Sequence, residues 1–278
     1  MGGRYKEMTP QRIANQIDEG RGQGEGKEFT PWFEATEFPT RGRMVRAKSL
    51  VTGRVMHMVS EIEGAYLHLI DFTPGVVDIR EQSLCDFEMT VDIARRLRVR
   101  HPRAWEGHLV PMTTDFLVTF DDAWGRRELA LSVKSEGELR GRKKARVFQK
   151  LAIEQLYHVA KGRSFLLVTD AGINPRVMSN LALLGEAFRS GSSEISDAEQ
   201  SAFERAFPRH EKDGSTIRER IDVAALASGL PSQKAIDAFR RAVWSRRILI
   251  DLRQWIRLNS EFVPTTDVNL GVELPWSR

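Results

Sequence analysis

Three residues of this sequence have types and a spacing that suit metal-dependent phosphodiester chemistry: Glu63, Asp115 and Lys134. Asp115 lies near the start of one predicted strand and Lys134 ends the next, which suits a hairpin whose two ends meet at one edge of a sheet. Carboxylate oxygens are the ligands that Mg²⁺ prefers. A lysine beside the metal orients water, or deprotonates it as the neutral amine, and its ammonium form stabilises the charge of the reacting phosphate.

Each of these residues also has a purely structural interpretation. Ser60-Glu-Ile-Glu63 matches a capping box, in which the Glu63 carboxylate only accepts a hydrogen bond from a backbone amide at the start of a helix. Asp115 and Lys134 are compatible with solvated strand ends. Spacing alone therefore leaves both the nuclease interpretation and the structural one open.

The cysteine, the histidines and the glycine-rich segment argue against several other kinds of functional site. The single cysteine, Cys85, excludes an internal disulfide and a cysteine-based zinc site. The six histidines show no His-Glu-x-x-His spacing. The glycine-rich segment 20–26 resembles a phosphate-binding P-loop, but Arg21 and Glu28 stand where that motif needs Gly and Ser or Thr. A flexible loop is therefore favoured there over a phosphate-binding backbone nest.

The composition is typical of a globular protein. Of 278 residues, 41% are hydrophobic and 29% charged, which argues against disorder and supplies a core. A net charge of +4 and a pI near 9.3 permit a nucleic-acid partner without requiring one. Neither a membrane-spanning apolar run nor a signal-peptide core at the start is present. We therefore expect a cytoplasmic protein that does not bind membranes.

The elements that position these residues are predicted to form one α/β domain over residues 1–170. Strands are expected at 43–49, 54–59, 76–80, 114–120, 127–134 and 164–169, and helices from Pro10 to Gly20, from Ser60, after Thr90 and over 148–159. The strand at 164–169 is continuously apolar, which predicts burial on both faces. A hairpin followed by a helix and a buried strand indicates a mixed sheet flanked by helices.

Residues 171–278 are predicted to form a second, mostly helical domain. The polar stretch 190–194 is the expected hinge. Helices are expected at 175–188, 197–206, 216–228 and 233–244, and strands at 247–251 and 261–264. Helix, tight turn, helix and hairpin is the order of a winged helix.

Two basic stretches favour a nucleic-acid partner. The first contains Arg140, Arg142, Lys143, Lys144, Arg146 and Lys150. Because it follows Lys134 directly, it would lie where a phosphate backbone approaches a metal site, and its DNA-binding candidates are Arg142, Lys143, Lys144 and Arg146. The second stretch, within 234–257, is explained equally well by a solubilising surface.

Several motifs occur in a specific order along residues 11–170. They are Glu19–Lys27 with Pro31-Trp32, Thr52-Gly-Arg54, Ser60-Glu-Ile-Glu63, Asp78-Ile-Arg-Glu-Gln82, Thr114-Asp-Phe-Leu117 and Ser132-Val-Lys134. In this order they resemble the TnsA family, the endonuclease subunits of heteromeric Tn-seven-type transposases. The resemblance implies a restriction-endonuclease-like catalytic domain. The C-terminal third resembles the family in layout more than in residues.

The resemblance also implies a site with two Mg²⁺ ions, for which Mn²⁺ would substitute. Glu63 and Asp115 would be metal ligands, Lys134 the catalytic lysine, and the Val133 backbone carbonyl a further ligand. The family has Gln two residues before the lysine, where this sequence has Ser132. Since a hydroxyl is a shorter oxygen ligand, Ser132 is a candidate ligand either directly or through water.

A division of labour follows from the same resemblance. A TnsA-like protein cuts the 5′ strands at the transposon ends, a TnsB-like transposase cuts and joins the 3′ strands, and a TnsC-like ATPase regulator docks on the C-terminal domain. The protein would act in a bacterium, at the nucleoid. Two alternatives stay open: a stand-alone restriction or repair nuclease of the same fold, and a winged-helix DNA-binding regulator without catalysis.

Overall fold

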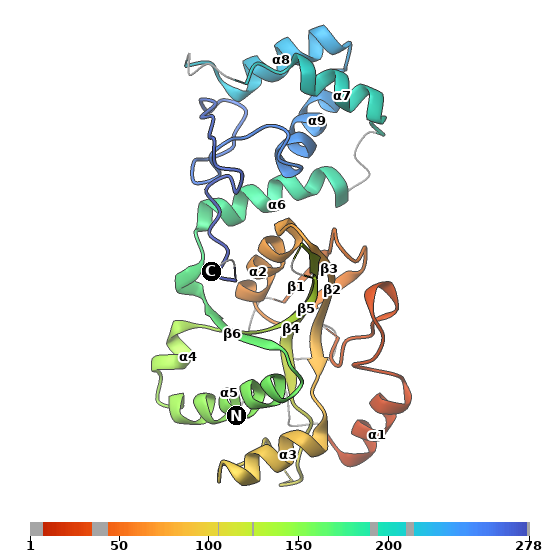
Figure 1. Cartoon of the computed structure of the whole chain (residues 1–278), viewed down its shortest axis with the longest axis vertical. Helices are drawn as coiled ribbons and strands as arrows, with labels where there is room; N and C mark the ends of the chain where they lie inside the picture. The colour runs from red at the N-terminus through yellow and green to blue at the C-terminus, as the bar shows by residue number, and fades with distance from the viewer. Residues whose placement is uncertain are drawn as a thin grey trace. The chain divides into compact units, whose positions relative to one another are not determined.

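The computed structural model describes residues 8–34, 44–104, 106–123, 125–189, 194–209 and 214–276. It divides into two compact units, Met1–Gly172 and Ile173–Arg278, which are treated separately below (Figure 1). Apart from Glu194, the stretch expected to be a hinge lies outside the described residues.

The first unit is built on a mixed four-stranded sheet with the order β3-β4-β5-β6. Its strands are β3 (Val76–Leu84), β4 (Thr113–Asp122), β5 (Gly125–Lys134) and β6 (Ser164–Thr169). β3, β4 and β5 are antiparallel neighbours, and β6 runs parallel to β5. A separate antiparallel hairpin joins β1 (Val45–Lys48) to β2 (Val55–Met58). The predicted α/β class with a mixed sheet is confirmed.

Five helices accompany this sheet (Figure 1). They are α1 (Pro10–Asp18), α2 (Glu61–Phe72), α3 (Phe87–Arg96), α4 (Glu136–Arg140) and α5 (Lys144–Ala160), with short 3-10 turns η2 (Gly26–Glu28) and η4 (Asp170–Gly172). Thr9 and Ser60 cap α1 and α2, as their residue types predict. The helix expected after Thr90 begins earlier, because the Asp86 carboxylate accepts a hydrogen bond from the Met89 amide and caps α3.

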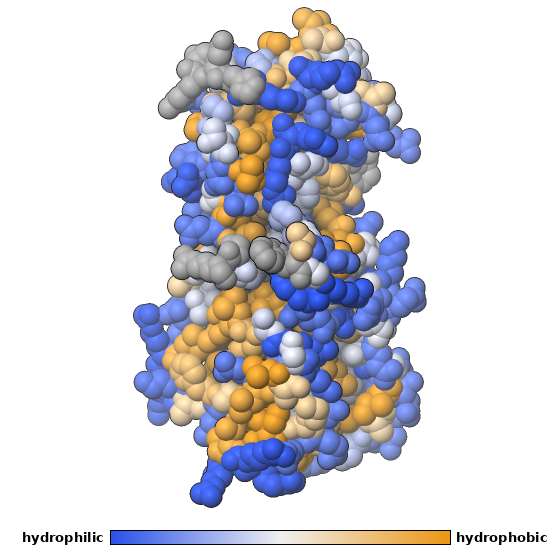
Figure 2. Space-filling model, in the orientation of Figure 1, coloured by the Kyte–Doolittle hydropathy of each residue, from blue (hydrophilic) through white to orange (hydrophobic). Residues whose placement is uncertain are grey.

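The strand β6 differs from its prediction, since it is not buried on both faces. It is one of the two edge strands of the sheet, and Val168 is its one buried residue. Figure 2 shows hydrophobic residues gathered over the region of β6 and α5, where Phe148, Leu156 and Val159 are exposed. A continuously apolar run predicts a strand, but it does not show whether the strand has a neighbouring strand on both of its edges or on one only.

The glycine-rich segment is held against β3, so the flexible-loop prediction is wrong. The Gly26 amide donates to Asp78 Oδ1 at 3.0 Å, and the Gly26 carbonyl accepts from Arg54 Nε. The two terminal nitrogens of Arg54 also donate hydrogen bonds to the two carboxylate oxygens of Glu81, at 2.9 and 2.6 Å. The side chains of Arg54 and Glu81 are 11% and 1% exposed. A buried, bidentate ion pair therefore joins this loop and the β1–β2 hairpin to the sheet.

The second unit contains α6 (Pro175–Arg189), α7 (Asp197–Ala206), α8 (Ile217–Ser228) and α9 (Ser232–Trp244). Its core includes a cluster of aromatic rings from Phe203, Phe207, Phe239 and Phe262. These helices match their predicted ranges to within a few residues. No helix among the described residues is both long and apolar enough to cross a membrane.

The hairpin expected at the end of the second unit is reduced to local pairing. Ile250 and Pro264 form an isolated antiparallel bridge, and the Asp251 amide donates to the Val263 carbonyl at 3.1 Å. The ranges 247–251 and 261–264 do not form regular strands. Pro264 has no amide hydrogen with which to extend the ladder. The chain order of a winged helix is present, but its hairpin is not a regular one.

Replacing Arg54 with Met tests the ion pair that fixes the glycine-rich loop. Because the substitution leaves the Glu81 carboxylate buried without its partner, it should lower the free energy of unfolding by about 3 kcal/mol. Urea denaturation measures this. The control is Arg95→Met, which removes an exposed α3 side chain paired with Asp92 and should leave the midpoint unchanged. Equal effects of the two substitutions would contradict the assignment.

Candidate active site

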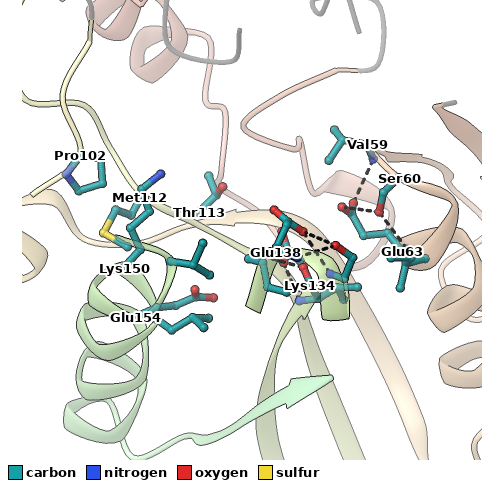
Figure 3. Close-up of a pocket in the computed structure, with 16 residues that line it drawn as sticks. Val59, Ser60, Glu63, Pro102, Met112, Thr113, Lys134, Glu138, Lys150 and Glu154 are labelled. Atoms are coloured by element: carbon teal, nitrogen blue, oxygen red, sulfur yellow. Dashed lines mark hydrogen bonds and ion pairs between the residues drawn. The ribbon is translucent and has the colours of Figure 1, made fainter. Parts of the chain in front are cut away.

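One cavity of the first unit, with a volume of about 410 Å³, collects side chains from five elements, α2, β4, β5, α4 and α5 (Figure 3). Glu63 enters it from α2, Asp115 from β4, Val133 and Lys134 from β5, and Glu154 from α5. Four of the five predicted site residues therefore line one space, although they are far apart in the sequence. The fifth, Ser132, does not line it.

Asp115 and Lys134 are in direct contact at the end of the β4–β5 pair. Lys134 Nζ lies 2.7 Å from Asp115 Oδ2 and 2.7 Å from the Val133 carbonyl oxygen. The Val133 amide also donates to Asp115 Oδ2, at 2.7 Å. Asp115 is 4% exposed, so these bonds form in a site with little water. The antiparallel register that pairs Phe116 with Leu131 brings the two strand ends together.

The charge of Lys134 is stabilised by its surroundings. Burial by itself disfavours the ammonium form, but Asp115, Glu154 and Glu63 outweigh it and hold the pKa of Lys134 above its usual value. A lysine that is charged at neutral pH can donate hydrogen bonds and stabilise anionic oxygens. It cannot accept a proton from water in that state, so the charged lysine is suited to stabilising negative charge and not to acting as a general base.

Glu63 bonds to the start of its own helix and also lines the cavity. The Ser60 hydroxyl accepts a hydrogen bond from the Glu63 amide at 3.2 Å and so caps α2. The Glu63 carboxylate accepts from the Val59 amide at 3.0 Å and from the Ser60 hydroxyl at 3.0 Å. The capping contact thus involves the Val59 amide instead of the Ser60 amide of a capping box. The same carboxylate lines the cavity, with only 4% of the residue exposed.

Ser132 lies behind the cavity wall. It is fully buried, and its hydroxyl donates to Glu154 Oε2 at 3.3 Å. In this arrangement Ser132 orients the Glu154 carboxylate. A metal contact from Ser132 would have to pass through Glu154 or a water molecule.

Glu154 is a site residue that the sequence analysis missed. It is 5% exposed, and its Oε1 atom is buried without a hydrogen-bond partner. Burial raises the pKa of Glu154 to about 7, although the Lys134 ammonium opposes the shift. A signal was present in the sequence. An acid stands between Leu151 and His158 on the face of α5 that is otherwise buried, and buried acids are rare without a specific reason.

A neutral polar layer lies behind Glu154. The Thr114 hydroxyl pairs with His158 Nε2 at 2.6 Å and contacts the Cys85 sulfur at 3.6 Å. Burial and the nearby Arg163 lower the pKa of His158 to about 4, so the imidazole is uncharged. Burial raises the pKa of the Cys85 thiol far above its usual value, so this cysteine is a poor nucleophile. The chemistry of the cavity therefore rests on its carboxylates and lysines.

The predicted DNA-binding residues lie at the start of α5, the helix that also lines the cavity. Arg142, Lys143 and Lys144 are exposed there. Arg146 instead donates to the Arg100 carbonyl and to Gln149, so it braces the helix. On the same helix, Val147, Lys150, Leu151 and Glu154 line the cavity. The basic end of α5 thus continues into the carboxylate site.

The donor atoms suit a hard divalent cation. Carboxylate and carbonyl oxygens are the ligands of Mg²⁺ in proteins, and the orphaned Glu154 Oε1 is a buried oxygen that lacks a donor or a cation. As the side chains stand, no group of three or more His, Cys, Asp or Glu within the described ranges is arranged as a metal centre. Binding would therefore require side-chain movement, chiefly of Lys134 and Glu63.

Comparisons with known proteins found one family match and one similar relative. Residues 73–170 match the family described as "TnsA-like endonuclease N terminal". The chain is also 37% identical over 173 residues to the "Transposon Tn7 transposition protein TnsA" of Escherichia coli. That match covers 62% of this chain and 62% of the relative. The family match contains Asp115, Lys134 and Glu154, and Glu63 precedes it.

Glu154→Gln tests the burial of this carboxylate in protein freed of metal with a chelator. The pKa of Glu154 is higher in the folded state than the usual glutamate value of 4.5. Its contribution to stability is therefore fully present below the unfolded pKa and is lost as pH rises through about 7. Glutamine does not titrate, so the variant should exceed the wild type in stability by about 2 kcal/mol near pH 8, with the difference closing towards pH 5.

Urea unfolding across this pH range measures the difference. Glu88→Gln, which changes an exposed acid on α3, is the matched control and should show no such pH-dependent difference. A Glu154→Gln protein that tracks the wild type at every pH would show that Glu154 is not held in a water-poor site.

Proposed function

We propose, from the match of residues 73–170 to the TnsA-like endonuclease N-terminal family and the similarity to the Escherichia coli transposition protein, that the protein is a Mg²⁺-dependent DNA endonuclease of a cut-and-paste transposase. It would cleave the 5′ strands at the transposon ends by attack of metal-activated water. The observation that carries the proposal is the cavity in which Glu63, Asp115 and Lys134 meet. The proposal includes two Mg²⁺ ions, for which Mn²⁺ would substitute, because carboxylate and carbonyl oxygens are the ligands these ions prefer.

Glu63, Asp115 and the Val133 carbonyl are the residues that would hold the metal. Bound there, Mg²⁺ supplies a water of lowered pKa and neutralises charge on the phosphate. The Lys134 ammonium stabilises the extra negative charge that develops on the non-bridging oxygens during attack. Glu154, oriented by Ser132, contributes a further oxygen at the back of the cavity. Ser132 would then influence metal binding indirectly, through Glu154 or water.

The DNA backbone would approach along α5. Lys143 and Lys144 lie at its exposed start, and Lys150 lies two turns further on, at the cavity itself. The N-terminus of a helix adds a partial positive charge in the same place. The scissile phosphate would thus be led from the basic end of the helix to the carboxylates. Arg142 extends this basic surface, whereas Arg146 acts by bracing the helix.

A transposase of this kind needs partners. The relative from Escherichia coli is named as a transposition protein, which supports a role beside a TnsB-like transposase and a TnsC-like ATPase regulator. The second unit, Ile173–Arg278, has its own aromatic core and is the proposed docking unit for the regulator. Several of its basic side chains bind within the unit, as Arg253 does with Asp251 and Lys234 with Glu199. Because these basic side chains are already paired, we favour the second unit as a docking unit for a protein partner over a role in binding DNA.

Asp115→Asn should abolish strand cleavage while the protein stays folded. The amide keeps an oxygen for the Val133 amide, but it loses the charge that a metal and Lys134 both need. The assay follows 5′-strand cleavage of plasmid carrying the element ends, with Mg²⁺, Mn²⁺ or chelator, and with or without the partner transposase. Asp122→Asn, at the far end of β4 and paired with Arg127, is the control and should cut normally.

The outcomes of this assay separate the alternatives. Full cleavage by a folded Asp115→Asn protein would overturn the site assignment. Cleavage of DNA without element ends, and without a partner, would point to a stand-alone nuclease. An absence of cleavage with every metal and partner, combined with DNA binding, would leave a regulator without catalysis.

The double substitution Lys143→Gln and Lys144→Gln tests the DNA path. Removing two phosphate contacts should weaken DNA binding at every sequence and reduce the slope of log affinity against log salt by about 2. Fluorescence anisotropy in Ca²⁺ at several salt concentrations measures both quantities. Arg95→Gln with Arg96→Gln, two exposed residues of α3, is the matched control. If both double variants lose affinity equally, general charge accounts for binding and the α5 path is wrong.

A further inference from the structure

The Lys134 ammonium lies where a cation would bind the site. Its nitrogen is 2.7 Å from Asp115 Oδ2 and 2.7 Å from the Val133 carbonyl oxygen. These are two of the oxygens proposed above as metal ligands. Both are buried, and each accepts a hydrogen bond from the same ammonium. The oxygen pair is thus already occupied by a positive charge that belongs to the protein.

The surroundings explain why a cation is needed there. Glu63, Asp115 and Glu154 are each at least 94% buried and line one cavity. Ionised carboxylates brought together in a water-poor space repel one another and lose hydration. A single ammonium between them offsets part of that cost. Because its nitrogen contacts an Asp115 oxygen and the Val133 carbonyl, Lys134 is placed to provide this charge in the absence of metal.

We propose that Lys134 is the resting counter-ion of this site, and that a divalent cation must displace its ammonium from Asp115 and the Val133 carbonyl in order to bind. This inference rests on the proposed function, because it concerns the same oxygens. A divalent cation bound to the same Asp115 oxygen would lie within a few ångströms of the ammonium, and two positive charges that close repel each other in a water-poor site. Metal loading and release of the lysine towards the substrate phosphate would then be one event.

The side chain of Lys134 is suited to such an exchange. It is 24% exposed, so its end has a path into the open part of the cavity. Lysine carries its charge on a flexible four-carbon stem and keeps it in either position. The protein without metal would hold its lysine away from the substrate. The lysine would become available only when the carboxylates have a metal to neutralise them.

Lys150 provides the comparison that isolates direct competition from general charge. It lines the same cavity and carries the same charge as Lys134. The ammonium that bonds Asp115 Oδ2 and the Val133 carbonyl is that of Lys134. Removing Lys150 lowers the positive potential of the cavity without vacating the oxygen pair. Removing Lys134 does both.

The first test is a calorimetric titration of the full-length protein with Ca²⁺, which binds carboxylate sites without supporting cleavage in most Mg²⁺ nucleases. We expect Lys134→Met to bind Ca²⁺ at least about tenfold more tightly than the wild type. Lys150→Met should change the affinity by at most about threefold. Lys134→Arg, which keeps a cation within reach of the same oxygens, should stay closer to the wild type than Lys134→Met does.

A second measurement uses the wild-type protein, so it does not depend on the folding of any variant. Acetylation of lysines by an amine-reactive reagent, read by mass spectrometry, reports how often each ammonium leaves its partners. Saturating Ca²⁺ should raise the labelling rate of Lys134 several-fold and leave exposed lysines such as Lys143 unchanged. Unchanged or slower labelling of Lys134 with Ca²⁺ bound would overturn the proposal.

The two proposals fail in different ways. If Lys134→Met binds Ca²⁺ no more tightly than Lys150→Met, or if no variant binds Ca²⁺, the exchange mechanism is wrong. If Ca²⁺ binds and the lysine is released as expected, but element-end DNA is never cut with Mg²⁺ and partner, the proposed endonuclease function is wrong and the ion exchange stands.

Discussion

The contact between Asp115 and Lys134 is the interaction on which the candidate site depends. It closes the end of the β4–β5 pair, because Asp115 Oδ2 receives both the Lys134 ammonium and the Val133 amide. Charges in a water-poor cavity are costly unless paired, and this ammonium offsets part of that cost for the carboxylates around it. Glu63 and Glu154, which reach the cavity from α2 and α5, both act on the charge of Lys134. The pairing of β4 with β5 therefore places Lys134 where carboxylates from α2 and α5 act on its charge.

Helix α5 connects this point to the surface. Its buried face carries Glu154 and His158, which bond to Ser132 of β5 and Thr114 of β4 respectively. Its first turns carry exposed lysines. A single rigid element thus fixes the back of the carboxylate site and sets the direction from which a phosphate backbone would come. The elements around the cavity are held in turn by buried pairs such as Arg54 with Glu81, which ties the β1–β2 hairpin and the glycine-rich loop to β3.

The second unit stabilises itself by a different means. Its helices pack on a cluster of phenylalanine rings, and the irregular chain that follows α9 is fixed by Asn180, whose side chain bonds the backbone of Leu252, Gln254 and Ile256. These contacts give the unit a core independent of the sheet. A unit with its own core and with basic residues largely engaged inside it is suited to docking a partner.

Local residue types determined much of this protein from the sequence alone. Thr9 and Ser60 predicted helix starts, alternation and apolar runs predicted the strands of the sheet, and the spacing of Asp115 and Lys134 predicted that their strand ends meet. Such features depend on neighbours within a few residues or on one hairpin. An acid on the apolar face of α5 was a signal for Glu154, but the contact of Ser132 with Glu154 could not be predicted, because it depends on which face of α5 packs against β5.

Only the tertiary structure decided where charge and burial lie. The apolar run of β6 did not reveal that it is an edge strand, and glycine content did not reveal that the loop at 20–26 is held by Asp78 and Arg54. The sequence predicted a lysine beside an acid, but not that its ammonium occupies the oxygens of Asp115 and Val133. The physical reason is that solvent exclusion and ion pairing arise between segments that are distant in the sequence. Composition and periodicity do not predict which of these segments come into contact.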